Sequence, residues 1–192
     1  MQLSKTAYYA DFVIYAAIVT ATVIVMAWRN SAHDFSIWLL AAFAGVMVWT
    51  LIEYVVHRFV FHQMPVFSPM HDAHHQAPLS LVGTPTWVSM AVIFIGVFLP
   101  AWALGSFNTA LGLAVGVMAG FFWYGLVHHA IHHRKPRMIA RRLIVTSRRH
   151  AQHHYAAEAG NFGVTTLFWD RIFGTVLNDS MERTVSRTNY QS

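Results

Sequence analysis

Histidine dominates the chemistry that this chain could perform. The sequence has 13 histidines among 192 residues, against 8 Asp and Glu together, and no cysteine. Imidazole is a common metal ligand, while the absence of thiolates excludes disulfides, cysteine-ligated zinc and cysteine-held iron–sulfur clusters. Only His33 stands apart, and we expect it to be an amphipathic anchor near a membrane surface. The others form four groups: His57 and His62; His71, His74 and His75; His128, His129, His132 and His133; and His150, His153 and His154.

The spacing within these groups predicts which imidazoles can converge. Residues three and four positions apart share one face of an α-helix, so the runs HDAHH and HAQHH each predict a site of three imidazoles. By the same rule His128 pairs with His132, and His129 pairs with His133. His57 and His62 are five positions apart, which is about 140° around an ideal helix. They can converge only at a helix end or a bulge, or they bind two different metals, and the spacing favours two metals over one.

Ten or more imidazoles are too many for one ion. Two ions with about four to six ligands each would use them, and iron suits imidazole while keeping positions open for O2. A dinuclear iron site beside a membrane could oxidise lipid C–H bonds. A low-affinity histidine-rich loop is the simpler alternative, but it would contain continuous histidine runs rather than groups at helix ends.

The elements that position these histidines are predicted to be membrane helices. The chain is 56% hydrophobic and only 11% charged, whereas soluble domains carry about 25% charged residues. Four apolar stretches, 12–28, 35–56, 87–104 and 109–127, each approach the roughly 20 residues that cross a bilayer. We therefore expect an all-α integral membrane protein with four transmembrane helices. It would form a single membrane-embedded domain, 1–192, with a helical cap at 57–86 and 128–178, and Pro100 should kink the third span.

The charge pattern predicts how this bundle is oriented. Four spans put both termini and all the grouped histidines on one side of the membrane. Of the 13 Lys and Arg residues, all except Arg29 lie on that side, so the positive-inside rule makes the termini and the metal site cytoplasmic. The net charge of +5 then indicates contact with lipid headgroups, and we expect no nucleic-acid partner.

Two segments of the cap carry further expectations. Apolar and basic residues alternate at helical spacing over 138–149, which predicts a basic amphipathic helix that either lies on the leaflet or packs in the cap. The apolar segment 162–177 is too interrupted to span a bilayer and should dock at its interface. The last dozen residues are polar and are expected to be disordered.

The ordered motifs resemble those of the integral-membrane fatty acid hydroxylase / sterol desaturase superfamily, over Glu53 to about Leu177. HRFVFH, HDAHHQAP, YGLVHHAIH and HAQHH match its histidine boxes, and NFGVTTLFWDRIFGT matches its C-terminal signature. That last run looks most like the branch that hydroxylates fatty acyl and sphingolipid chains. A carotenoid or sterol hydroxylase or desaturase is the alternative within the superfamily.

The resemblance implies a set of site residues. The ligands of two iron ions would be His57, His62, His71, His74, His75, His128, His132, His150, His153 and His154. His129 and His133 are extra and are assigned to orienting or surface roles. Glu53, Asp72, Tyr124 and Asn161 are possible partners for the second ring nitrogen of a ligand, and Asp170 is expected to order the C-terminal segment. Zinc can replace iron at such imidazoles in purified protein.

The resemblance also implies an O2-dependent monooxygenase that acts on a fatty acyl or related membrane lipid. Nothing before Phe12 could be an attached cytochrome b5 domain, so electrons should come from a separate cytochrome b5-like protein or from a ferredoxin with its reductase. The oligomeric state stays open. A metal-handling membrane protein would need polar groups along the spans, and a haem electron carrier would need histidines at facing depths within them. The sequence shows neither pattern.

Overall fold

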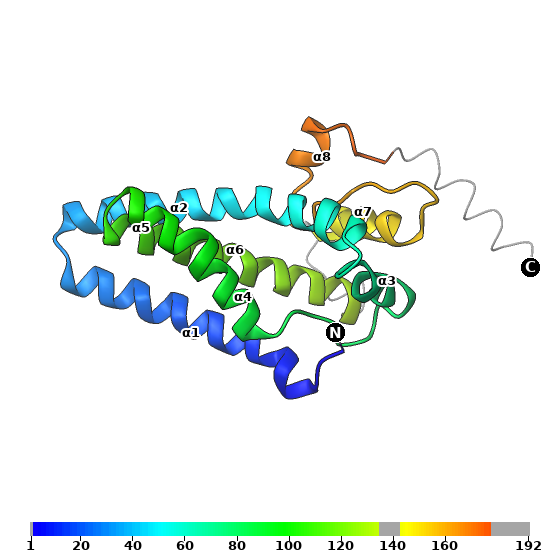
Figure 1. The fold of residues 1–192 in the computed structure, drawn as a ribbon, viewed down its shortest axis with the longest axis horizontal. Helices are drawn as coiled ribbons and strands as arrows, with labels where there is room; N and C mark the ends of the chain where they lie inside the picture. The colour runs from blue at the N-terminus through cyan, green and yellow to red at the C-terminus, as the bar shows by residue number, and fades with distance from the viewer. Residues whose placement is uncertain (1, 135–142, 178–192) are drawn as a thin grey trace, which may run out of the picture.

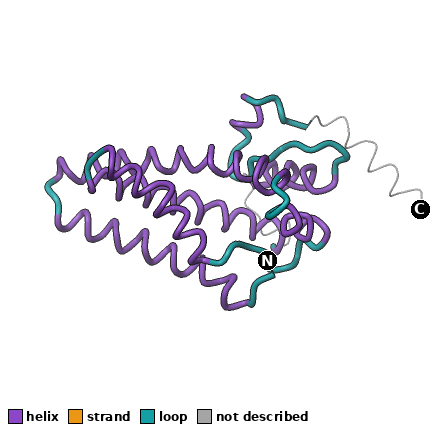
Figure 2. Tube along the Cα trace, in the orientation of Figure 1, coloured by secondary structure: helices purple, strands orange, loops and turns teal. Residues whose placement is uncertain are grey.

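A computed structural model describes residues 2–134 and 143–177, and its regular structure is helical (Figures 1 and 2). Within that described part no residues form a strand, apart from an isolated bridge between Gln2 and Val82. The long elements are α1 (Lys5–Arg29); α2 (Ala32–Val55), which continues into the π-helix η1 (Val56–Phe61); the consecutive α4 (Thr86–Ile93), η2 (Phe94–Phe98) and α5 (Leu99–Leu104); and α6 (Phe107–His133). The short helices are α3 (Ser68–Gln76), α7 (Leu143–Tyr155) and α8 (Phe168–Ile172).

The four predicted spans are confirmed, although each helix is longer than its apolar stretch. The helices long and apolar enough to cross a membrane are Lys5–Arg29, Ala32–Phe61, Thr86–Leu104 and Phe107–His133. Ser4, Ser31 and Ser106 each cap the N-terminus of a helix by accepting a hydrogen bond from a backbone N–H three residues later. Hydropathy detects only the apolar part of a helix, so it missed these polar first turns and placed His57 and His128–His133 in the cap rather than on α2–η1 and α6.

Helices α2 and α6 pack closely because small residues line their contact. A Cβ atom added to Gly112 would meet the backbone oxygen of Trp38, and one added to Gly116 would meet that of Ala42. Gly45 on α2 lies equally close to α6. Small residues spaced four apart let membrane helices approach at backbone distance, so this glycine seam fixes the two helices that carry His57 and His128.

The third span is irregular where a kink was expected. Pro100 is the second residue of α5, which follows directly on the π-helical turn Phe94–Phe98. Proline has no N–H, and its ring crowds the carbonyl four residues earlier, which here is that of Gly96 within the widened turn. The disturbance at Pro100 therefore takes the form of a π-helical turn.

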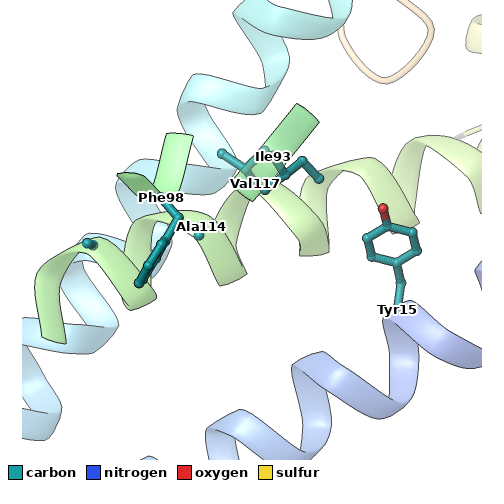
Figure 3. Close-up of a cluster of buried hydrophobic side chains, with 6 residues drawn as sticks. Tyr15, Ile93, Phe98, Ala114 and Val117 are labelled. Carbon is teal, nitrogen blue, oxygen red and sulfur yellow. The ribbon is translucent and has the colours of Figure 1, made fainter. Parts of the chain in front are cut away.

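Buried apolar side chains from α1, α4, η2 and α6 form the core of the bundle. Tyr15 of α1 is fully buried with Ile93 and Val117 (Figure 3), and its hydroxyl donates to Ser89 Oγ at 2.8 Å. Other large apolar side chains point outward, including Leu40 (69% exposed) and Ile24 (61% exposed). An apolar exterior around a modest core is typical of a bundle whose solvent is lipid.

The helices α3, α7 and α8 gather at one end of the bundle, beside the ends of α2–η1 and α6 (Figure 1). Of the expected amphipathic helix at 138–149, residues 138–142 lie outside the described residues, and the rest belongs to α7. The expected disordered tail, the last dozen residues of the chain, also lies outside the described residues. The segment 162–177 buries Phe162 and Val164 but exposes Phe168 and Phe173.

Candidate metal centre

Ten histidines converge in two groups of five at the cap end of the bundle. The first group is His57, His62, His71, His75 and His153, and the second is His74, His128, His132, His150 and His154. Within each group the ring nitrogens that could bind a metal all lie within 4.8 Å of one another. These are the ten histidines that the sequence motifs singled out. The structure leaves His129 and His133 out of both groups.

The two groups are built by the same rule. Each group contains two pairs of histidines, and the members of a pair lie one helical turn apart on the same helix. The fifth member is a crossing histidine: it comes from a helix whose other two grouped histidines belong to the other group. In the first group the pairs are His57/His62 and His71/His75, and the crossing residue is His153. In the second group the pairs are His128/His132 and His150/His154, and the crossing residue is His74.

This crossing corrects the expectation that each HxxHH run supplies one site of three imidazoles. In α3, His71 and His75 point to the first group, while His74 points to the second. Adjacent residues lie about 100° apart around a helix, so His74 and His75 diverge although both lie near the face of His71. The spacing indicates a shared face, but it does not specify how many ions that face contacts.

His57 and His62 join the same group because the π-helix η1 contains His57 and ends directly before His62. In a π-helix residue i bonds to residue i+5, so two side chains five positions apart stand one turn apart and on one side. Their ring centroids are 5.2 Å apart. The preference for two different metals at this pair was therefore wrong, and the bulge that was left open as an alternative is what occurs.

The spacing of the ring nitrogens suits metal ions. The near-neighbour Nε2 atoms are 2.8–3.2 Å apart, for example 3.0 Å between His57 and His71 and 3.1 Å between His74 and His128. Nitrogens bound to one ion at about 2.1 Å lie between about 3 and about 4.2 Å apart. The short distances match the lower value, and the 4.8 Å spread is slightly above the upper one.

Hydrogen bonds fix two imidazoles of the first group with their Nε2 lone pairs facing inward. His57 Nδ1 donates to the carbonyl oxygen of Phe162 at 2.5 Å, and His153 Nδ1 donates to that of Gly160 at 2.8 Å. A neutral imidazole has one N–H, so both Nε2 atoms must be acceptors. Several lone pairs that face one point repel one another unless a cation lies between them, and such orientation by the second nitrogen is usual for metal-bound histidine.

The charge state of the cap histidines also suits metal binding. Burial, together with the nearby imidazoles, lowers the pKa of His74 to about 4 and that of His153 to about 3. The same causes hold the pKa of His71 and His150 well below the usual value. Neutral imidazole is the form that binds metal, so these rings are ready to bind at neutral pH.

Two buried carboxylates hold the loop that supplies the two carbonyl groups. Asp170 is fully buried and accepts hydrogen bonds from the backbone N–H groups of Phe162 and Gly163, both at 2.8 Å. Glu53 of α2 accepts from the backbone N–H groups of Val164 and Thr165 at 2.6 and 2.8 Å. The run FGVTT thus directs its N–H groups to carboxylates, while carbonyls of the same loop orient histidines.

The other residues proposed to orient imidazoles have different contacts. Glu53 hydrogen-bonds the backbone N–H groups of Val164 and Thr165, as described above, rather than a ring nitrogen of an imidazole. Asn161 donates to Gln152 Oε1 at 3.0 Å and accepts from the backbone N–H of Leu177. Its φ of 53° lies in the left-handed region, which Asn tolerates better than most residues.

Tyr124 stacks on the ring of His128, with the two planes 11° apart. Asp72 lies beside His62 and His75, where its charge raises the pKa of both and so opposes the effect of burial. His129 faces α1, where its Nδ1 lies 3.1 Å from the hydroxyl of Tyr8. Its ring also stacks with that of His133, 4.6 Å away.

Cavities reach the histidines from two sides. An apolar cavity of about 510 Å³ runs between α1, α2, the third span and α6, and it touches the site at His128. A polar cavity of about 360 Å³ opens on the cap and is bordered by Asp72, His75, His154 and Glu158. The centre therefore lies between a hydrocarbon-lined space on the membrane side and a polar opening on the other.

Sequence reasoning missed two parts of this site. The carbonyls of Gly160 and Phe162 are backbone groups and so leave no side-chain signal, although the NFGVTT run marked their position. The α1 residues Phe12 and Tyr15 line the apolar cavity, and in the sequence they look like any apolar helix positions.

Comparison with known proteins gives concordant matches. Residues 42–175 match a family model described as fatty acid hydroxylase. Dihydroceramide fatty acyl 2-hydroxylase FAH2 of Arabidopsis thaliana is 28% identical over 184 residues, which are 91% of this chain and 75% of the relative. Ceramide very long chain fatty acid hydroxylase SCS7 of Saccharomyces cerevisiae is 33% identical over 193 residues, covering 91% and 47%.

The fold matches as well. The solved structure described as "Full length scs7p (only hydroxylase domain visible)" superposes with a TM-score of 0.76 at 27% identity, over 91% of this chain and 68% of that one. The chain spans between 47% and 75% of the two curated relatives.

Proposed function

The chain belongs to the fatty acid hydroxylase family, and from that premise we propose that it hydroxylates the acyl chain of a ceramide or related membrane lipid at carbon 2. The matches confirm the resemblance seen in the sequence and favour this branch over carotenoid or sterol enzymes. The observation that carries the proposal is the meeting of an apolar cavity with two five-imidazole groups at His128. The chain would work as one membrane-embedded domain.

We assign the ten grouped histidines as ligands of two iron ions, with O2 as co-substrate. The bound irons would supply the oxidising chemistry: one oxygen atom enters a C–H bond, and the other leaves as water with two electrons and two protons. The all-nitrogen donor set and the inward lone pairs of His57 and His153 fit such ions. Zinc would fit the same nitrogens but lacks the redox chemistry.

The protein's own part is to bind, orient and shield. The cavity wall between Phe121 and Val97 is hydrocarbon and holds an acyl chain without competing hydrogen bonds. Tyr124, stacked on His128, keeps that imidazole at the cavity wall. Asp72 and Glu158 line the polar opening, which gives water and protons a route that avoids the lipid side.

Sidedness and electron supply are further parts of the proposal. The charge distribution of the sequence favours a cytoplasmic cap, and a basic cap favours an acidic donor protein of the cytochrome b5 or ferredoxin type. Accessibility of an N-terminal tag in sealed vesicles tests the side. A tag protected on the lumenal side would contradict it.

Metal analysis combined with lipid mass spectrometry tests the function. Protein purified from iron-supplied cells should contain two non-haem irons per chain and, with ceramide, a reductant and isotope-labelled O2, should yield 2-hydroxyacyl lipid carrying the label. His128→Ala should lose the product, whereas His33→Ala, which alters the one isolated histidine, should keep it. Unlabelled product, or full activity in His128→Ala, would contradict the proposal.

A further inference from the structure

The apolar cavity is not closed at its deep end. Val92 and Gly96 of the third span both line it, yet Val92 is 63% exposed and Gly96 is exposed as well. At similar depth Ile93 and Val117 are buried against each other (Figure 3). The wall of the cavity is therefore interrupted on the outer, lipid-facing side of the third span.

Gly96 is the gap in that wall. A Cβ atom added there would meet nothing within 4 Å, whereas its neighbours Phe94 and Ile95 present large side chains that are 50% and 64% exposed. Glycine is unfavourable inside a helix, and here no close backbone contact requires it. What the glycine leaves is open space between the cavity and the surrounding hydrocarbon.

The cavity is too short for a long acyl chain, which would therefore need an opening at the deep end. Along α6 the lining runs from His128 to Val117, and these 128 − 117 = 11 residues rise about 16 Å. An extended chain advances about 1.2 Å per bond, so the cavity takes about 13 bonds beyond a carbon placed at His128. A long acyl chain does not fit between the histidines and the deep end.

We propose that Gly96 forms a lateral opening through which the acyl tail passes into the bilayer, so that chains longer than the cavity are accepted. This inference rests on the proposed function. The occupant is an acyl chain because the lining at this depth is hydrocarbon, the opening lies within a membrane span, and the other end of the cavity reaches His128. Gly96 would thus determine specificity for chain length without touching the reacting carbon.

Substitution of Gly96 by Phe tests the opening. The new side chain starts in free space and adds no helix-propensity cost, so the bundle should fold. In vesicles that hold equal amounts of ceramides with acyl chains of about 12 and about 24 carbons, the ratio of long to short hydroxylated product should fall at least tenfold. Ile95→Phe places the same group one residue away, outside the lining, and should leave the ratio unchanged. An unchanged ratio in active Gly96→Phe would overturn the inference.

A second measurement needs no turnover. The chain has no cysteine, so Gly96→Cys in the metal-free protein carries a single thiol. Ceramide with an acyl chain of about 24 carbons should slow its alkylation by a membrane-soluble maleimide severalfold, whereas a chain of about 12 carbons should not. Ile95→Cys should be insensitive to both. Equal rates of Gly96→Cys alkylation with either lipid would refute the opening, even in a preparation with no hydroxylase activity. If the long-chain ceramide alone slowed alkylation while the wild-type protein hydroxylated no lipid, the result would count against the proposed function and not against the opening.

Discussion

Replacement of Asp170 should weaken metal binding at the first histidine group and leave binding at the second group unchanged. Its Oδ1 accepts from the Phe162 N–H at 2.8 Å and the Thr175 hydroxyl at 2.7 Å, while Oδ2 accepts from the Gly163 N–H at 2.8 Å. In Asp170→Asn, whichever position receives the NH2 group faces a donor. One buried donor therefore loses its partner, at about 1–3 kcal/mol, and the remaining bonds become neutral and about half as strong. The total cost should be about 3 kcal/mol.

The effect on metal binding should be confined to the first group. The loop held by Asp170 supplies the carbonyls that orient His57 and His153, and both belong to that group. In the second group, by contrast, the Nδ1 atoms of His150 and His154 are buried and have no hydrogen-bond partner among the described residues. Loss of an orienting partner weakens metal binding by about 10–100-fold.

The assay is iron content per chain at increasing chelator concentration, with thermal unfolding measured alongside. Asp170→Asn should release one ion at about 10–100-fold lower chelator than wild type and keep the other. Asp34→Asn makes the same chemical change at an exposed N-terminal turn of α2 and should leave the release curve unchanged. The reasoning would be refuted if Asp170→Asn released both ions at the same chelator concentration. It would also be refuted if Asp170→Asn had a lowered Tm but released iron at the same chelator concentrations as wild type.

Three other outcomes are expected. His74→Ala and His150→Ala should each abolish lipid hydroxylation while the protein still fractionates with membranes; product at wild-type level in either would count against the ligand set. Gly116→Val places a methyl group against the backbone of α2 and should cost about 3 kcal/mol, seen as a lowered Tm that Gly105→Ala does not share. Burial lowers the pKa of His62 and His74 from 6.5 to about 4 in the folded protein, so the unfolded chain binds more protons between these values. The Tm of metal-free protein should then be highest above about pH 6.5 and fall as the pH drops towards 4; a flat profile would exclude this linkage.

The sequence was sufficient to predict the elements and the grouping of histidines at one end. Apolar stretches of about 20 residues have the length of a membrane-spanning helix rather than of a strand, and histidines four apart on a helix share a face. It was insufficient where one spacing allows two geometries. The five-residue step from His57 to His62 depends on a π-helix. The split of His74 from His75 depends on which histidines of the other helices lie nearest to each of them. Glu53 shows the same limit, because a carboxylate can serve an imidazole or a backbone N–H equally well.

The crossing of histidines between helices has a consequence for how the cap is held together. His62 and His153 are 91 residues apart in the chain, and His74 and His128 are 54 apart. In the proposed holoenzyme the metal–ligand bonds of each ion would cross-link such distant segments of the chain. A cross-link that closes a loop of about 100 residues removes about 4–5 kcal/mol of chain entropy from the unfolded state. This chain has no cysteine, so its metals would provide the cross-links that disulfides provide in other small proteins.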